Sequence, residues 1–497
     1  MRVAVLASLF AHLAIAACAG RAYQGSSAYD EGEYGMSPSQ SYVSTDYKPV
    51  ALNFEVIVND TTKSQVSDGY LFFAPRGSAV SMNAGIILDQ QGRMNWSGRD
   101  YGATFTFCVT QYQGEDHILI TPVGLDGSGV DLHETVVTTN DTVIMSVYHP
   151  IAYDLSAYRG PSDGYLLDGV FQKINITSGE EIFTWHASDH VEPGECYDDP
   201  SDDNVSAESA FDYFHINSIQ KDDYGHYLIS SRHCHTIYYL NSTGDILWRL
   251  GGSQSSFTIG EGADFAWQHH ARWRSTTQIS LFNNANLDRF SEGTSRGMLL
   301  DLDFDAKAAS LVTEFIPFNQ TYSESWGSTP YLSEHDSDGN IIWAARYGLD
   351  GDSSSTSYRA LRYNWTGRPT DLPSVTISPG SDANTTIYVH WNGATEVRTW
   401  QLFGSCAATP QDAQSLQNTT WLDFETAIVW QGTSDYAYFQ VAAMDADRQV
   451  LSYSNFTAAD GSGEQLAVAD NQTVTAGDPD GNTNTYTSVQ IEYSITM

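Results

Sequence analysis

The sequence predicts an all-β protein in which a β-propeller of about six blades precedes an immunoglobulin- or fibronectin-like β-sandwich. Short apolar runs separated by Gly, Asn, Asp and Ser dominate the 497 residues, and long helical periodicity is absent. A hairpin that ends in tryptophan recurs between residues 85 and 343. Hydrophobic residues make up 41% of the chain, which is enough for a substantial core.

The clearest blade spans residues 215–252. It contains four strand-like runs separated by the turn sequences DDYG and NSTGD, at His215–Ile219, His226–Arg232, Thr236–Asn241 and Ile246–Leu250. Four antiparallel strands in about 40 residues is the size of one propeller blade.

A strand, a Gly-containing turn and a strand ending in tryptophan occur at Gly85–Trp96, Val170–Trp185, Ile237–Trp248 and Tyr331–Trp343. These copies fit the outer two strands of successive blades, which must stack because one blade cannot bury both its faces. The unit that follows Trp326 lacks room for a second strand, and Gly124–Val130 is also compressed.

Three units place a histidine at the head of their first strand, namely His133, His215 and His269. Because the first strand of each blade lines the central channel of a propeller, we expect the three imidazoles to converge on one axial site.

The two ends of the chain differ from the middle in composition and in the pattern of apolar residues. Residues 1–19 have the apolar run and small-residue end of a secretory signal peptide, which predicts a secreted protein, and residues 20–50 read as a flexible leader. The propeller is expected over residues 51–368, and the β-sandwich with an Asn/Thr-rich tail over residues 369–497.

The net charge of −38, from 23 basic and 61 acidic residues, excludes nucleic acid as a partner. Beyond the signal, no segment is apolar enough to span a membrane. Twelve N-x-S/T sequons predict N-linked glycans, at Asn59, Asn95, Asn140, Asn175, Asn204, Asn241, Asn319, Asn364, Asn384, Asn418, Asn455 and Asn471.

Four cysteines remain after removal of the signal: Cys108, Cys196, Cys234 and Cys406. They allow two disulfides in three connectivities, among which the sequence does not choose, and their spacing matches no zinc signature.

Several motifs in one order, FHINSI, SSRH, LGG, QHHAR and SLFNNA, resemble the arylsulfotransferase family, and specifically its fungal-type secreted branch. The resemblance implies a six-bladed propeller with an added β-sandwich. It also implies transfer of a sulfuryl group from a phenolic sulfate ester to a phenol through a sulfohistidine, with neither a nucleotide sulfate donor nor another cofactor.

The resemblance assigns roles by motif. His269 of QHHAR is the expected nucleophile, while His215, Arg232 and, by its blade position, His133 are expected to bind sulfate or to move protons. Substrate contacts are expected from Asn217, Ser218 and His270. These residue types suit the reaction, because a neutral imidazole is a competent nucleophile and a guanidinium presents a planar set of donors to sulfuryl oxygens.

Three other interpretations stay open. The histidines could be hydrogen-bonding residues that tie strand starts together. A metal site could combine His233 and His235, on one strand face, with His269 or His270, although Arg232 and the missing carboxylate argue against it. Finally, the propeller could bind glycan or protein without catalysis.

Overall fold

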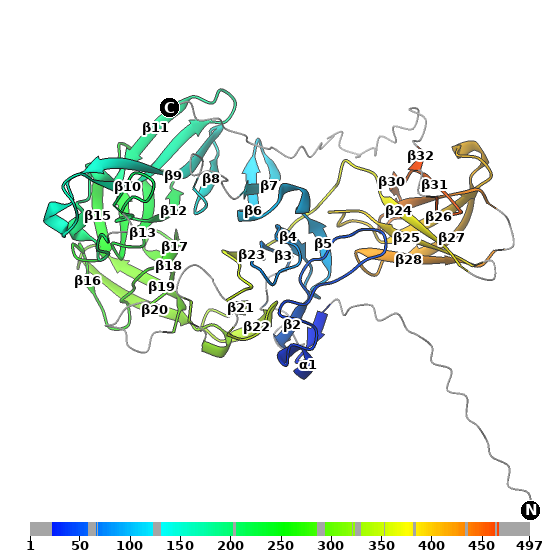
Figure 1. Cartoon of the computed structure of the whole chain (residues 1–497), viewed down its shortest axis with the longest axis horizontal. Helices are drawn as coiled ribbons and strands as arrows, with labels where there is room; N and C mark the ends of the chain where they lie inside the picture. Colours follow the sequence, from blue (N-terminus) through cyan, green and yellow to red (C-terminus); the bar gives the residue numbers. More distant parts are fainter. Residues whose placement is uncertain are drawn as a thin grey trace, which may run out of the picture.

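The computed structural model describes residues 22–57, 66, 68–122, 131–201, 205–285, 294–320, 322–323, 330–351, 353–380, 384–432, 436–462 and 465–466. Within these ranges the protein is all-β, as predicted: one short α-helix (α1, Ser27–Asp30) accompanies a succession of small sheets. Figure 1 shows the sheets of residues 131–315 at one end of the molecule and the C-terminal sheets at the other. Single 3-10 turns lie at Arg99–Tyr101, Ser156–Tyr158, Ala187–Asp189, Pro193–Glu195, Phe318–Gln320 and Pro410–Asp412.

The four strands predicted over residues 215–252 form a four-stranded antiparallel sheet in the order β12-β13-β14-β15. The strand bounds agree with the prediction to within two residues: β12 Ile216–Lys221, β13 Tyr227–Ser231, β14 Thr236–Leu240 and β15 Ile246–Gly251. Their alternating apolar residues bury both faces, so the sheet contributes to two separate core clusters.

The two neighbouring sheets repeat this order. One comprises β8 Thr135–Thr138, β9 Thr142–Tyr153, β10 Gly164–Asn175 and β11 Glu181–His186. The other comprises β17 His269–Trp273, β18 Gln278–Asn283, β19 Arg296–Asp303, β20 Ala308–Phe315 and β16 Thr258–Ile259. The first strand of each sheet, β8, β12 or β17, lies at one edge of that sheet.

Two further sheets are completed by distant parts of the chain. In the first, β21 Tyr331–His335 and β22 Ile341–Arg346 are joined by β2 Leu52–Val56 and β1 Ala22–Gln24. In the second, β3 Tyr70–Phe73, β4 Ile86–Leu88 and β5 Met94–Ser97 are joined by β23 Ala360–Tyr363. Between β5 and β8 in sequence, β6 Thr104–Tyr112 and β7 Glu115–Pro122 form a two-stranded sheet.

All four predicted tryptophan hairpins form, as β4–β5, β10–β11, β14–β15 and β21–β22. Residues 324–329, where the unit after Trp326 is shortened, lie outside the described residues, as do Gly124–Val130 and the signal peptide.

The prediction of a flexible leader over residues 20–50 is wrong for residues 22–50. β1 pairs in parallel with β2, and Tyr29 is fully buried, with its hydroxyl donating to the Ala51 carbonyl at 3.3 Å. The Gln40 side chain is also buried and donates to the carbonyls of Val50 and Gly92. A Ser/Tyr/Gly-rich composition resembles a disordered segment, but its few large residues are enough to anchor it here.

The C-terminal strands form two sheets that share one core, which contains Ile387, Trp400 and Val441. One sheet is β24 Ser374–Pro379, β25 Thr385–His390 and β28 Glu425–Trp430. The other is β27 Gln414–Thr420, β26 Thr399–Ser405, β29 Tyr438–Met444, β30 Val450–Tyr453, β31 Phe456–Ala458 and β32 Gln465–Leu466.

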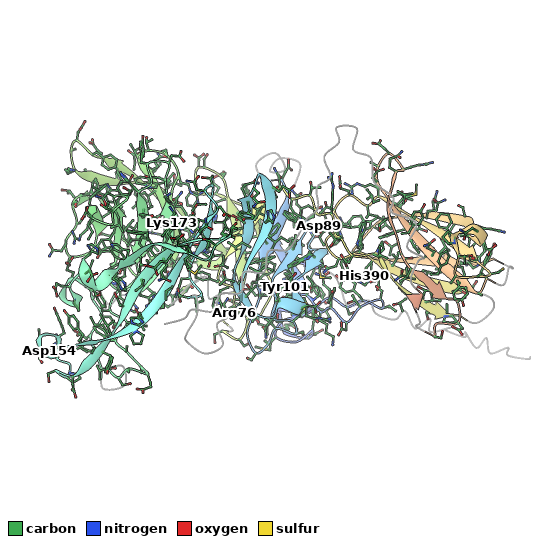
Figure 2. All side chains as sticks on the ribbon, turned by 90° about the horizontal axis from the view of Figure 1, so that it is seen from above. Arg76, Asp89, Tyr101, Asp154, Lys173 and His390 are labelled. Carbon is green, nitrogen blue, oxygen red and sulfur yellow. A yellow bond between two sulfur atoms is a disulfide. The ribbon has the colours of Figure 1, made fainter. Side chains whose placement is uncertain are left out.

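This C-terminal unit is joined to the rest of the chain by polar contacts. His390, labelled in Figure 2, has its Nδ1 2.8 Å from the Ser44 hydroxyl, and Glu425 accepts from the Ser44 backbone N–H at 2.5 Å. Asn95 is buried, and its amide donates to the Ala394 carbonyl at 3.2 Å. Asn95 therefore cannot carry a glycan in this fold, which corrects one of the twelve predicted sequons.

Cys196 and Cys234 form a disulfide, while Cys108 and Cys406 are free. In the described part of the chain, no helix is both long and apolar enough to cross a membrane.

Replacing Tyr29 with Ala should lower the free energy of unfolding by about 3–5 kcal/mol, because it leaves a large cavity. Tyr34, in the same segment but 48% exposed, is the matched control, and Tyr34→Ala should cost less than about 1 kcal/mol. Urea unfolding measures both values. If both substitutions lowered the free energy of unfolding by the same small amount, the segment would be flexible, as the composition predicted.

Candidate functional site

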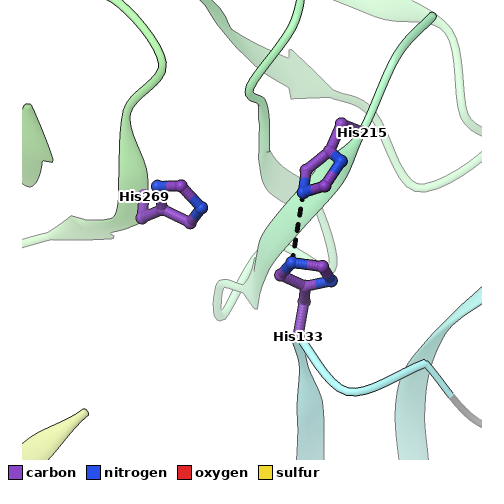
Figure 3. A group of neighbouring side chains, drawn as sticks. All are labelled: His133, His215 and His269. Atoms are coloured by element: carbon purple, nitrogen blue, oxygen red, sulfur yellow. Dashed lines mark hydrogen bonds between the residues drawn. The ribbon is translucent and has the colours of Figure 1, made fainter. Parts of the chain in front are cut away.

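His133, His215 and His269 meet, as the repeated strand pattern predicts. His133 and His215 lie just before β8 and β12, and His269 begins β17, so each comes from the edge strand of a different sheet. The Nε2 atoms of His133 and His215 are 3.1 Å apart, and the His269 ring centroid lies 6.4 Å from each of the other two (Figure 3). We call these three residues the histidine cluster.

Every imidazole of the cluster is held through its Nδ1 atom. The acceptors are Asp131 Oδ2 for His133 (2.8 Å), Asp212 Oδ2 for His215 (2.5 Å) and Asn284 Oδ1 for His269 (2.7 Å). With Nδ1 engaged in this way, the Nε2 atoms are left to face one another and any ligand.

The tautomer of His269 follows from its partner. The Asn284 side-chain amide donates to the Ser323 carbonyl at 2.9 Å, so its oxygen is the atom that faces His269. His269 Nδ1 must then carry a hydrogen and donate it, which leaves a lone pair on Nε2 of the neutral ring. That Nε2 atom is buried and has no hydrogen-bond partner among the described residues.

Burial, reinforced by His133 and His215, holds the pKa of His269 well below its ordinary value. The ring is consequently neutral over the whole physiological range, and its Nε2 lone pair is not lost to a proton. A buried acceptor without a partner is rare in folded proteins, and it points to a ligand or reacting group at this position.

His133 and His215 form a second functional unit with their two aspartates. Three hydrogen bonds join Asp131, His133, His215 and Asp212 in a row, and each needs one proton. Burial raises the pKa of Asp212 and lowers that of His215, which brings the two groups toward equal proton affinity. This row of hydrogen bonds connects the two carboxylates through the two imidazoles.

Arg232 lies in the turn between β13 and β14, where its backbone N–H donates to the His215 carbonyl at 2.9 Å. Its guanidinium is placed by His233, whose Nε2 accepts from Arg232 Nη1 at 2.7 Å, and by Trp267, whose ring centroid lies 4.4 Å away. The Arg232 charge contributes, after burial and the neighbouring histidines, to the low pKa values of His215 and His269. Arg232 thus makes the cluster favourable for an anion.

His233 and His235 occupy this same turn and are not on one strand face, so that part of the predicted metal arrangement is wrong. The His233 Nδ1–H donates to the Asp212 carbonyl, and the His235 ring stacks on Tyr197 at 4.3 Å. The disulfide from Cys234 to Cys196 links the turn to the segment that carries Tyr197.

The side chains of Asn217 and Ser218, which were predicted to contact substrate, form hydrogen bonds with backbone groups of a neighbouring segment. The Asn217 amide donates to the Gln268 carbonyl at 2.7 Å, and the Ser218 hydroxyl accepts from the Ala271 N–H at 3.1 Å. Both side chains therefore hold β12 against the segment that contains His269.

His270, the third predicted substrate residue, is outside the histidine cluster. A register shift interrupts the pairing of β17 with β18 between His269 and Arg272, and the φ angle of His270 is +58°. Its ring instead lines a hollow of about 420 Å³ together with Arg274, Phe282 and Phe315. His269 therefore faces the cluster and His270 does not, a difference that the motif QHHAR alone did not show.

The sequence reasoning missed the residues that orient the cluster. Asp131, Asp212 and Asn284 all lie close to a recognisable motif, and the spacings D-x-H and D-x-x-H were available as a signal. It also missed Tyr148 and Tyr358, whose rings flank the cluster at 6.2 and 5.8 Å from His133 and whose hydroxyls donate to β12 carbonyls.

Among the residues that the structure describes, two groups of side chains could hold a metal ion. The histidine cluster offers three nitrogen atoms within 4.8 Å of one another, and Asp212, His215 and His233 form a second group. Three imidazoles with carboxylate or amide partners on the far nitrogen suit zinc or copper. The adjacent positive charge of Arg232 opposes a cation.

Burial, followed by His215, lowers the pKa of His233 to about 3. In the unfolded state the pKa of a histidine is about 6.5, so as the pH falls only the unfolded state takes up a proton at His233. The free energy of unfolding should therefore fall by up to about 1.4 kcal/mol per pH unit. Gln at position 233 can still donate and accept hydrogen bonds but does not titrate. The His233→Gln variant should therefore lose up to about 1.4 kcal/mol per pH unit from the slope of the free energy of unfolding against pH. Urea unfolding of both proteins between about pH 6.5 and 4 measures it, and an unchanged slope would contradict the assignment.

Several solved structures align weakly with the chain. A protein of unknown function from Bacteroides caccae has 10% identity and a TM-score of 0.30, over 59% of this chain and 100% of its own. A duf4221 family member from Bacteroides vulgatus has 7% identity and a TM-score of 0.19, over 66% of this chain and 84% of its own.

No curated protein matches the chain. The profile of the arylsulfotransferase (ASST) family, by contrast, matches residues 86–348, a range that contains the whole histidine cluster and Arg232. The chain therefore belongs to the arylsulfotransferase family.

Proposed function

We propose that this protein moves a sulfuryl group from a phenolic sulfate ester to a phenol through a sulfohistidine on His269, without a nucleotide sulfate donor. The observation that carries the proposal is the His269 Nε2 atom: it is buried, lacks a protein partner and keeps its lone pair because Nδ1 donates to Asn284. A fixed, neutral imidazole of this kind is a nucleophile that needs no base to activate it.

In the first step, His269 Nε2 attacks the sulfur of the aryl sulfate and the bond from sulfur to the aryl oxygen breaks. The sulfuryl oxygens carry the developing charge, and the Arg232 guanidinium, held by His233 and Trp267, is the group placed to stabilise it. By analogy with phosphoryl transfer, positioning and charge stabilisation supply most of the catalysis.

The leaving phenolate requires a proton, and the proton shared by His133 and His215 can supply it. In the second step the acceptor phenol returns a proton to this pair while its oxygen attacks sulfur and the nitrogen–sulfur bond breaks. Asp131 and Asp212 keep both imidazoles oriented through the cycle. Proton and sulfuryl group are thus both balanced over one turnover.

The remaining features belong to the same proposal. The sheets of residues 22–363 would form a propeller of about six blades, closed by β2 and β23, and the C-terminal pair of sheets an immunoglobulin- or fibronectin-like domain. The signal-like residues 1–19 and the exposed sequons, such as Asn140 and Asn319, support a secreted glycoprotein of the fungal-type branch.

A second candidate function is metal binding by the histidine cluster, favoured by its three nitrogen atoms within 4.8 Å. Stoichiometric zinc or copper in purified protein, lost on His133→Asn, would support it. A non-catalytic propeller that binds glycan or protein is the outcome if folded protein turns over no aryl sulfate.

The testing experiment follows release of 4-nitrophenol from 4-nitrophenyl sulfate, with phenol as acceptor and no nucleotide. Replacing His269 with Ala should lower the rate at least about a thousandfold, because the nucleophile is removed. His270→Asn is the matched control and should leave the rate nearly unchanged, since His270 lines a different hollow. Loss of activity in the His270 variant alone would contradict the assignment.

A further inference from the structure

Trp267 precedes His269 by two residues and has an unsatisfied polar atom of its own. Its indole Nε1 is buried, yet it has no hydrogen-bond partner among the described residues. Its backbone φ is +55°, a conformation that is unfavourable for a bulky residue and that tends to persist where function requires it. The other half-buried tryptophan nearby, Trp273, instead packs edge-on against Tyr239 and Trp248 in a core cluster.

The surroundings of Trp267 show what its missing partner should be. The Arg232 guanidinium lies over the ring at 4.4 Å, and the rings of His233 and His235 meet it edge-on at 5.1 and 5.0 Å. An indole N–H can only donate, so its partner must be an acceptor. A positively charged guanidinium beside that donor favours an acceptor that is negatively charged.

Trp267 and His269 therefore present two buried nitrogen atoms of opposite character on one short segment. Trp267 Nε1 is a donor without an acceptor, and His269 Nε2 is a lone pair without a donor or electrophile. A sulfate ester satisfies both, because its oxygens accept hydrogen bonds while its sulfur is electrophilic. A cation would satisfy only His269.

We propose that Trp267 is a substrate-binding residue whose indole N–H donates to an oxygen of the sulfate group, beside Arg232. This inference rests on the proposed function, since it names the contacts of the same substrate. Tyr197, which is 39% exposed and stacks on His235, lies at the outer side of this aromatic group. The Cys196–Cys234 disulfide ties it there.

Binding of inorganic sulfate tests the inference without requiring turnover. Trp267→Phe keeps an aromatic ring and removes only the N–H, so the sulfate Kd measured by calorimetry should rise about tenfold or more, the effect of losing a hydrogen bond to a charged group. Trp273→Phe is the matched control and should bind like the wild type. An unchanged Kd in Trp267→Phe, or no sulfate binding by the wild type, would overturn the inference.

A second measurement observes the wild-type protein directly and needs a variant only to assign the resonance. With ¹⁵N-labelled tryptophan, saturating sulfate should shift the Trp267 indole N–H resonance, assigned by its absence from Trp267→Tyr or Trp267→Phe. A spectrum in which sulfate shifts no indole resonance would also overturn the inference. Sulfate binding that depends on Trp267 in a protein with no turnover would sustain this inference and refute the proposed sulfotransferase reaction.

Discussion

The geometry of this site depends on hydrogen bonds to the Nδ1 atoms of its three histidines. Asp131, Asp212 and Asn284 each take one of these bonds and so direct the Nε2 atoms toward a common point. The acceptors differ in kind: the Asn284 amide oxygen fixes the neutral His269 ring with its lone pair on Nε2, whereas the carboxylates of Asp131 and Asp212 orient His133 and His215. One kind of contact thereby gives similar side chains different roles.

The fold makes these bonds possible by bringing three edge strands together. Each histidine lies at the start of such a strand, while the turn after β13 supplies Arg232 and the bulge in β17 turns His270 away. The net charge of the protein is −38, whereas Arg232 places a positive charge beside neutral imidazoles at this site. The proposed aryl sulfate is an anion and would approach against the overall field, so short-range contacts at the site would have to provide its binding energy.

The sequence was sufficient to predict the strands and the meeting of His133, His215 and His269, because a repeated unit places one residue at equivalent positions. It could not predict partners that follow no common rule: Asp131 precedes its histidine by two residues, Asp212 by three, and Asn284 lies on the far side of β18.

Other differences also arise from tertiary packing. Composition alone suggested a flexible leader, but a few buried contacts, such as that of Tyr29, fix residues 22–50. The strand predicted to end at Arg232 ends one residue earlier, so Arg232 lies with His233 and His235 in the turn between β13 and β14. A backbone bulge is likewise invisible in the pattern of apolar residues, so neither the register shift beside His269 nor the positive φ of His270 could be predicted.

The most direct test of this account is to identify the atom that carries the sulfuryl group. Protein mixed with 4-nitrophenyl sulfate in the absence of acceptor would be quenched at alkaline pH, where a sulfohistidine should survive, and its peptides analysed by mass spectrometry. The account predicts one adduct, on His269. An adduct on His133, His215 or His270, or release of 4-nitrophenol with no histidine modified, would contradict it.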